Sequence, residues 1–411
     1  MKVLQINQTY IHGGSTGRIV YELLLTQQKA GIDGYVVYGY SDGEAMDGHS
    51  LCLQRNHIRR KFNILKTRLF DVHGFYNEYE TKVLLRLIEE MRPDVIHLHN
   101  IHNHYVHVGH LFEFIKEHNI PVIWTLHDCW SFTGHCCYFD YVHCDKWKTI
   151  CHDCPSIRNY PQTWSFDRTD KNYKLKRKTF TGVKNLTLVT PSRWLANLTR
   201  ESLLKEYPVE IINNGVDTNV FRPTVNNVKE QLGIRDKKMI LAVAAIFERR
   251  KGTEYLLQLP KLLSDDEVLV LVGHNEDQQN LFVQDHCIGI GKTNSVVELA
   301  DYYSAADVFI NPTLEDNFPT TNLEALACGT PVVTFKTGGS PESIDENVGR
   351  VVEKGDIEGM LDSVREITSR GKNYYTINCV NKARNLYNRD IQYMKYVNLY
   401  NEVYERSDGK A

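Results

Sequence analysis

Short apolar segments rich in β-branched residues alternate with helical stretches along the whole chain of 411 residues. This alternation is typical of βαβ units, in which each helix crosses back over the sheet so that the strands run parallel. The segments expected as strands are Val3–Ile6, Tyr35–Tyr38, Val95–Leu98, Val122–Leu126 and Leu186–Thr190 in a first group, and Glu210–Ile212, Met239–Ala245, Val268–Val272, Val308–Ile310 and Pro331–Thr334 in a second. We therefore predict an α/β protein with two doubly wound parallel sheets.

Chain length and turn signals predict where the two domains meet. A single core stops growing at roughly 250–300 residues, and this chain is longer. Tyr207-Pro208 ends a helical stretch, and Asn213-Asn214-Gly215 has the composition of a turn. We expect a first domain over residues 1–206, a second over residues 207–385 and a C-terminal helix over residues 386–411.

Charge and hydropathy exclude several classes of protein. The formal net charge of -3 gives no sign of a nucleic-acid partner, which normally requires a clear basic excess. Met1–Asn7 does not resemble a secretory signal, and no apolar run approaches the roughly 18 residues that cross a bilayer, so we expect a cytoplasmic protein. Residues 55–68 combine basic and apolar side chains at helical spacing, which fits either a solvated helix or one docked at the inner face of a membrane.

Polar loops after two strands of the second group have the chemistry of a nucleotide diphosphate site. Arg249, Arg250 and Lys251 can neutralise phosphates, while Asp316 can accept from hexose hydroxyls and Glu324 from ribose hydroxyls. The helix expected from Thr320 offers the free backbone amides of its first turn, which lie between Asp316 and Glu324 in the sequence. Both loops follow the carboxyl ends of strands of one sheet, where ligands of such folds bind. The residues expected at this site are Gly13, Gly14, Arg249, Arg250, Lys251, Asp316, Asn317, Phe318, Pro319, Thr320, Thr321 and Glu324.

Gly13 and Gly14 belong to a glycine loop, His12–Arg18, between the first strand and a helical pattern. Such a loop lets backbone amides approach an anion or a sugar. A tight strand-to-helix turn without any ligand would have the same composition.

Several motifs together resemble the retaining glycosyltransferases of family 4. They are the glycine loop, the turn Asn214–Asp217, the pair Lys251-Gly252, the element from Asp316 to Glu324 followed by Ala327–Val332, and Thr337–Glu342. The resemblance covers nearly the whole chain and implies the GT-B fold. In that fold two Rossmann-like domains face each other across a cleft, and a C-terminal helix crosses back to the first domain.

The resemblance also implies roles for individual residues. Lys251 and Arg250, or Arg249 in its place, hold the pyrophosphate, and Glu324 binds the ribose. Asp316 stands where the family has a glutamate, so Glu315 is an alternative for contacting the hexose. In the first domain His127 lies beside the reacting sugar. The residues expected to carry the chemistry are thus His127, Asp316, Lys251 and Arg250, with His99, Asn100 and Asp128 facing the acceptor.

A member of this family would move a hexose from a UDP- or GDP-sugar to a glycan or lipid-linked acceptor, with retention, in surface polysaccharide synthesis. No Asp-x-Asp occurs in the sequence, so we expect no cofactor for catalysis and expect cations and helix amides to stabilise the leaving diphosphate. A sugar-nucleotide epimerase of the same fold and a non-catalytic binding module with a cysteine knuckle are the alternatives.

Six of the ten cysteines lie within residues 129–154, directly after the strand that carries His127. Cys136, Cys144, Cys151 and Cys154 have the spacing C-x7-C-x6-C-x2-C, which is similar to structural zinc sites. Buried thiols or a disulfide are the alternatives. We expect this segment to recognise the acceptor, since such loops often carry binding residues.

Overall fold

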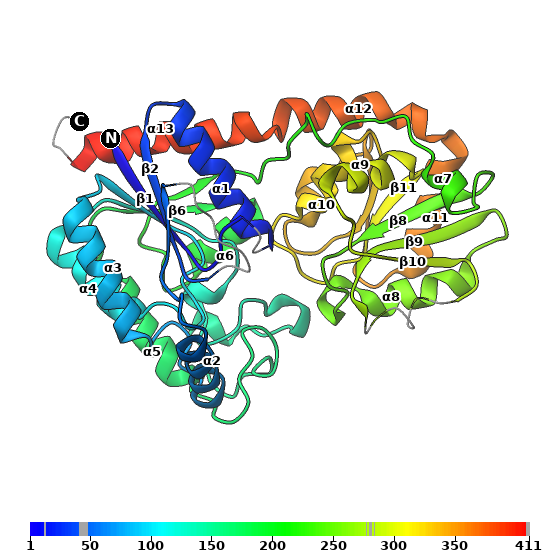
Figure 1. The fold of residues 1–411 in the computed structure, drawn as a ribbon. Helices are drawn as coiled ribbons and strands as arrows, with labels where there is room; N and C mark the ends of the chain where they lie inside the picture. Colours follow the sequence, from blue (N-terminus) through cyan, green and yellow to red (C-terminus); the bar gives the residue numbers. More distant parts are fainter. Residues whose placement is uncertain (12–13, 41–47, 277, 279–281, 283, 408–411) are drawn as a thin grey trace. The chain divides into compact units, whose positions relative to one another are not determined.

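The computed structural model describes residues 1–11, 14–40, 48–276, 278, 282 and 284–407, which form two α/β units (Figure 1). One unit comprises Met1–Ile212 together with Tyr393–Ala411, and the other comprises Asn213–Gln392. Each unit is built on its own sheet, and all strand pairs of both sheets are parallel. The prediction of two parallel sheets is therefore confirmed.

The first unit contains a seven-stranded sheet in the order β3-β2-β1-β4-β5-β6-β7. Its strands are β1 (Lys2–Asn7), β2 (Asp33–Tyr38), β3 (Ser50–Cys52), β4 (Val95–Leu98), β5 (Val122–Thr125), β6 (Leu186–Thr190) and β7 (Val209–Ile211). Its helices are α1 (Gly14–Lys29), α2 (His57–Phe70), α3 (Glu78–Met91), α4 (Val108–His118), α5 (Thr169–Phe180) and α6 (Arg193–Glu201), with the 3-10 turns η1 (Trp130–Phe132), η2 (Asp140–Val142) and η3 (Lys146–Lys148).

The second unit contains a six-stranded sheet in the order β10-β9-β8-β11-β12-β13. Its strands are β8 (Lys238–Val243), β9 (Glu267–His274), β10 (Cys287–Gly291), β11 (Val308–Asn311), β12 (Val332–Phe335) and β13 (Gly349–Val352). The helical elements are α7 (Val228–Gln231), η4 (Arg249–Lys251), α8 (Thr253–Gln258), η5 (Leu259–Leu262), α9 (Val296–Ala305), α10 (Thr320–Ala327), η7 (Ser340–Ser343), α11 (Ile357–Arg370) and α12 (Lys372–Leu386). The last helix, α13 (Arg389–Ser407), starts in this unit.

Strand β7 corrects one sequence expectation. The segment Glu210–Ile212 was assigned to the second sheet, but β7 pairs with β6 at the edge of the first, with Leu188 opposite Val209. The chain therefore divides after Ile212 and not at residue 206. The strands β3, β10 and β13 escaped prediction because they are short or contain glycine, which weakens the apolar pattern.

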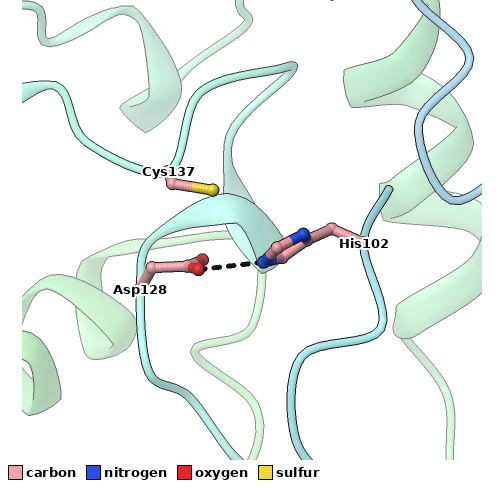
Figure 2. Close-up of side chains that lie close together, drawn as sticks. All are labelled: His102, Asp128 and Cys137. Atoms are coloured by element: carbon pink, nitrogen blue, oxygen red, sulfur yellow. Dashed lines mark hydrogen bonds and ion pairs between the residues drawn. The ribbon is translucent and has the colours of Figure 1, made fainter. Parts of the chain in front are cut away.

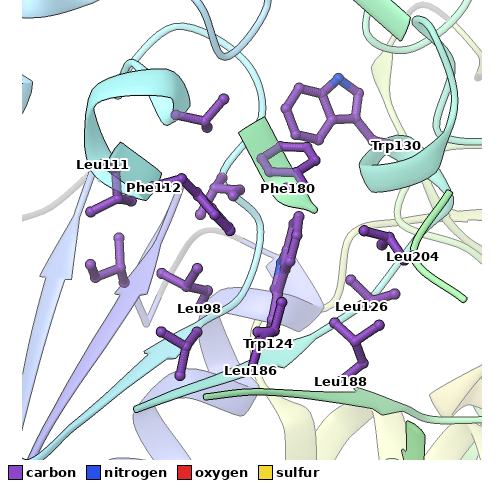
Figure 3. Packing of buried hydrophobic residues seen from close by; sticks show 14 of the residues in the cluster. Leu98, Leu111, Phe112, Trp124, Leu126, Trp130, Phe180, Leu186, Leu188 and Leu204 are labelled. Carbon is purple, nitrogen blue, oxygen red and sulfur yellow. The ribbon is translucent and has the colours of Figure 1, made fainter. Parts of the chain in front are cut away.

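An aromatic cluster fills one face of the first sheet (Figure 3). Trp124 of β5 lies against Phe180 of α5 and Phe112 of α4, with ring centroids 4.9 Å and 5.5 Å away. The ring of Trp130 in η1 also contacts Phe180, at 6.1 Å. The loop after β5 is thus anchored to the same core as the strand that precedes it.

The opposite face of the first sheet is covered by α13. Val95 and Ile123, which alternate with residues of the aromatic face, pack in one cluster with Tyr393, Tyr396 and Tyr400. The expectation that the C-terminal helix joins the first domain is confirmed.

Two buried hydrogen bonds fix α13 on this face. The Tyr400 hydroxyl donates to His97 Nδ1 at 2.7 Å and accepts from Gln27 Nε2 at 2.8 Å. Burial lowers the pKa of His97 well below its usual value, so the ring is neutral and Nδ1 can accept.

Replacing Tyr400 with Phe should lower the free energy of unfolding by about 1–3 kcal/mol, because His97 and Gln27 would lose a buried partner. Urea unfolding followed by tryptophan fluorescence measures the change. Tyr374→Phe, on a tyrosine that is 60% exposed, is the matched control. Equal stability of the two variants would contradict this account of α13.

Candidate functional site

Three loops at the carboxyl end of the second sheet are joined by hydrogen bonds into one surface. Leu314 N donates to Arg250 O at 2.8 Å, which joins the loops after β11 and β8. Gly339 N donates to Asp316 O at 2.9 Å, and this bond adds the loop after β12. The residues predicted after different strands therefore lie together in this unit.

Two glycines allow these loops to approach. Gly252 has a φ of +74°, and a Cβ there would lie 1.9 Å from Pro312 O. Gly338 has a φ of +55°, and its Cβ would lie 2.1 Å from Asp316 O. Neither distance leaves room for a side chain, and positive φ itself favours glycine.

A compact charge cluster occupies this surface. Lys251 Nζ lies 2.5 Å from Asp316 Oδ2, and Arg250 Nη1 lies 3.9 Å from the same oxygen. Burial opposes ionisation of Asp316, but the charges of Lys251 and Arg250 outweigh it and lower its pKa. Arg250 also donates to Glu315 O at 2.9 Å, whereas Arg249 is exposed. The geometry favours Arg250 over Arg249 as the second cation of the cluster.

Asp316 and Glu315 differ in their access to solvent. The side chain of Asp316 is 15% exposed, while Glu315 is completely buried. Of the two carboxylates considered for the hexose, Asp316 is the one that reaches the surface.

Helix α10 begins at Thr320, directly after Pro319. Glu324 lies about one turn inside, and its Oε2 accepts a hydrogen bond from Tyr303 at 2.9 Å. Asn317 and Phe318 are buried, and Phe318 O accepts from Asn214 Nδ2 at 2.9 Å. Thr320 and Thr321 are partly exposed at the start of the helix.

Sequence reasoning missed Asn322, which holds α10 in place. It is completely buried and accepts from Asn311 Nδ2 at 2.9 Å at the end of β11. Its own Nδ2 donates to Ser340 O at 3.3 Å. The sequence did contain a signal for this role, which is an amide side chain within an otherwise apolar stretch of the predicted helix.

In the first unit, His99 and His127 form a hydrogen-bonded pair at the ends of β4 and β5. His99 Nε2 donates to Gln5 Oε1 at 3.1 Å, which leaves His99 Nδ1 to accept from His127 Nε2, also at 3.1 Å. Burial lowers the pKa of His127 to about 4 and that of His99 well below its usual value. Both rings are therefore neutral at pH 7, with defined tautomers. Asn100 lies next to them, and its N–H donates to Asn7 Oδ1 at 3.1 Å.

Asp128 turns into the protein (Figure 2). Its Oδ2 accepts from His102 Nε2 at 3.1 Å and its Oδ1 from Trp130 N at 2.9 Å. Burial opposes its ionisation, but His102 lowers its pKa. With Cys137, these side chains form the one group of three metal-ligating atoms within 4.8 Å of each other in the described part of the chain. The hydrogen bonds explain the group without a metal, since they fix the start of the loop after β5.

The four cysteines expected to bind zinc are in the same packed loop. Of these described residues, no three sulfur atoms all lie within 4.8 Å of one another, unlike the ligand atoms of His102, Asp128 and Cys137. Cys136 donates to Cys154, and this hydrogen bond lowers the pKa of Cys154 to about 7. Cys151 Sγ accepts from Gly134 N at 3.1 Å. All ten cysteines are free thiols in the structure.

Lys176 of α5 binds the backbone of this loop. The sequence did not predict this role, because a lysine in a helix is normally an exposed surface charge. Lys176 is buried, and its Nζ donates to Trp130 O at 2.6 Å and to Thr133 O at 3.0 Å. Burial lowers its pKa to about 7.

Gly14 is exposed at the start of α1, and Gly13 lies outside the described residues.

The sequence matches two family models. One, described as Glycosyl transferases group 1, matches residues 225–385. The other, described as Glycosyltransferase Family 4, matches residues 13–220, half of the chain. The chain belongs to glycosyltransferase family 4. This family 4 glycosyltransferase is thus a transferase enzyme, and neither the epimerase nor the binding-module alternative is supported.

Relatives of this family 4 glycosyltransferase include the putative colanic acid biosynthesis glycosyl transferase WcaC of Escherichia coli (strain K12). That protein is 26% identical over 421 residues, which cover 98% of this chain and all of WcaC. The N-acetyl-alpha-D-glucosaminyl L-malate synthase of Bacillus anthracis is 27% identical over 198 residues, which cover 45% of this chain and 51% of that protein.

Solved structures share the fold over the full length. Sucrose-phosphate synthase from Thermosynechococcus elongatus has a TM-score of 0.73 at 18% identity and covers 99% of this chain, with all of that chain matched. Anabaena HepE in complex with UDP-glucose has a TM-score of 0.68 at 13% identity and covers 98%, again with all of that chain matched. The family 4 glycosyltransferase therefore has the GT-B fold. Of its described helices, none combines the length and hydropathy needed to cross a bilayer.

Because the first unit contains buried histidines, we expect its free energy of unfolding to fall in mild acid. Burial lowers the pKa of His104 and His127 to about 4, and unfolding returns each to its usual value near 6.5. Because the unfolded chain then binds protons that the folded one does not, the free energy of unfolding should fall as pH drops from about 6.5 towards 4. His104→Gln should remove up to about 3 kcal/mol of this dependence.

Melting temperatures measured across this pH range test the effect. His57→Gln, at an exposed histidine, should keep the wild-type slope. If His104→Gln also keeps it, His104 does not contribute as described.

Proposed function

We propose that the chain transfers a hexose from a UDP- or GDP-sugar to a glycan or lipid-linked acceptor, with retention, in surface polysaccharide synthesis. The convergence of Arg250, Lys251 and Asp316 with the start of α10 is the observation that carries this proposal. The name of the colanic acid relative supports the pathway, and the complex of Anabaena HepE with UDP-glucose supports the class of donor.

The donor would lie on the surface formed by the three loops of the second unit. Lys251 and Arg250 supply positive charge for the diphosphate, and the amides at the start of α10 add fixed donors. Glu324, oriented by Tyr303, accepts from the ribose hydroxyls. Asp316 holds the two cations in place and accepts from a hydroxyl of the hexose.

In the reaction, the bond between the anomeric carbon and the diphosphate oxygen breaks, and the electron pair leaves with the diphosphate. Cations and helix amides stabilise this developing charge. The acceptor hydroxyl attacks the same face of the oxocarbenium-like sugar, and its proton passes to the departing diphosphate. No side chain acts as nucleophile.

His127 and His99 would serve the sugar and the acceptor at the end of the first sheet. With its Nε2 proton directed to His99, His127 presents a neutral polar ring at the end of β5. This arrangement can orient a hydroxyl without adding positive charge beside an oxocarbenium-like sugar. Asn100 contributes to acceptor binding, and Asp128 holds the loop that follows His127.

Lys251→Met and Glu324→Gln should each lower kcat/KM for the donor, by about 100-fold or more for Lys251 because it would contact the charge formed in the transition state. Lys261→Met, which removes an exposed lysine of η5 in the same unit, is the control and should leave turnover unchanged. Nucleotide diphosphate release with a panel of UDP- and GDP-sugars measures the rates, and melting curves confirm folding.

The same assay discriminates between reactions. Transfer with retention gives a product whose anomeric configuration, seen by NMR, matches the donor. An isomerised sugar in place of a transferred one, or full turnover by both variants, would overturn the proposed function.

We also propose that Cys136, Cys144, Cys151 and Cys154 bind a structural zinc ion. The loop after β5 has only short 3-10 turns, so its own backbone provides little support. The N–H donated by Gly134 to Cys151 would stabilise a thiolate ligand. The Cys136–Cys154 contact brings the first and last ligands of the set together.

Purified protein should contain about one zinc per chain by elemental mass spectrometry, and Cys154→Ser should reduce the zinc content and lower the melting temperature. Cys287→Ser, in the second unit, should retain the metal. Zinc-free wild-type protein, or unchanged zinc in Cys154→Ser, would contradict the site.

A further inference from the structure

The buried side chains of helix α2 are polar, whereas most of its apolar side chains are exposed. Among its residues, the buried ones are Asn63 and Thr67. Ile58, Phe62 and Leu65 follow one another at the i, i+4, i+7 spacing of a single stripe, and they are 83%, 52% and 43% exposed. A surface helix normally turns such a stripe towards the core, so α2 presents its hydrophobic side to something outside the fold.

The exposed stripe continues onto a neighbouring segment. Trp164 N donates to Arg68 O at 2.7 Å, and the ring of Phe166 stacks on Phe70 with centroids 5.7 Å apart. Trp164, Phe166 and Phe70 are themselves exposed. We call this surface the α2 face, and its residues are Ile58, Phe62, Leu65, Phe70, Trp164 and Phe166.

Basic side chains surround the α2 face although the whole chain is slightly acidic. Helix α2 contains no acidic residue, and its cations are Arg59, Arg60, Lys61, Lys66 and Arg68. Several of them lie over aromatic rings, such as Lys66 over Phe62 at 4.7 Å and Arg68 over Trp164 at 5.4 Å. This arrangement keeps the charges at the rim of the apolar surface.

We propose that the α2 face docks on an anionic lipid surface. Apolar side chains of this size can enter the boundary between headgroups and acyl chains, while the surrounding cations pair with lipid phosphates. The charges that α2 places around the apolar surface are all positive, which matches the phosphates of anionic lipid and commits the proposal to a lipid partner.

The α2 face is linked to the acceptor end of the first sheet. Arg60 lies 4.2 Å over the ring of Tyr40, and Tyr40 stacks on His104 at 5.3 Å. His104 belongs to the loop after β4, which begins with His99 and Asn100. Docking would thus place lipid near the residues proposed to bind the acceptor. The docking does not depend on the proposed transfer, because it rests on the exposed face alone.

Sedimentation of the full chain with vesicles, without donor or acceptor, tests the proposal. Wild-type protein should bind vesicles that contain phosphatidylglycerol, should not bind pure phosphatidylcholine, and should be released by salt. The triple variant Ile58→Ser, Phe62→Ser, Leu65→Ser should bind at least about tenfold more weakly. Lys61→Glu should weaken binding about fivefold or more.

The matched control carries Val297→Ser and Ile377→Ser, which remove exposed apolar side chains from the second unit, and it should bind as wild type does. All variants should keep wild-type melting curves and donor turnover, since none alters the proposed catalytic residues. Three outcomes would overturn the proposal: no binding of wild type to anionic vesicles, equal binding by the triple variant, or self-association of wild type that the triple variant abolishes.

Discussion

The proposed donor surface depends on backbone coming very close to backbone. At Gly252 and Gly338 the loops after β8, β11 and β12 approach to distances that no side chain permits. This approach brings Arg250 and Lys251 to Asp316, and their charges keep that largely buried carboxylate ionised. Glu248 Oε1 also lies 2.9 Å from Arg250 Nη2, so the two cations face two carboxylates in the structure. A diphosphate would be bound by these cations together with the backbone amides at the start of α10.

In the first unit, the polar histidine rings near the strand ends are held in place in their neutral form. His99 and His127 are fixed as neutral tautomers through Gln5, and His97 is held by Tyr400 of α13. Burial prevents protonation of these rings. The expected loss of stability in mild acid and the absence of positive charge at the proposed sugar contact therefore have one cause, which is the burial of these rings.

The sequence was most informative where structure is local. Most of the strands and the start of α10 at Thr320 could be predicted because each depends on a few neighbouring residues. The network of His97 with Tyr400, the anchoring of α10 by Asn322 and the burial of Lys176 could not, because each depends on residues far apart in the chain. The pattern of α2 showed an amphipathic helix, but only packing reveals that Asn63 and Thr67 face inward.

The position of α13 has a consequence for the synthesis of the protein. One face of the first sheet is covered by Tyr393, Tyr396 and Tyr400, close to the end of the chain. While the ribosome is still translating the second unit, that face is covered only in part, by Ile19 and Leu23 of α1, although all seven strands have already emerged. The unit that is made first is therefore the one completed last, and the nascent chain must keep an apolar sheet surface from aggregating until its final helix arrives.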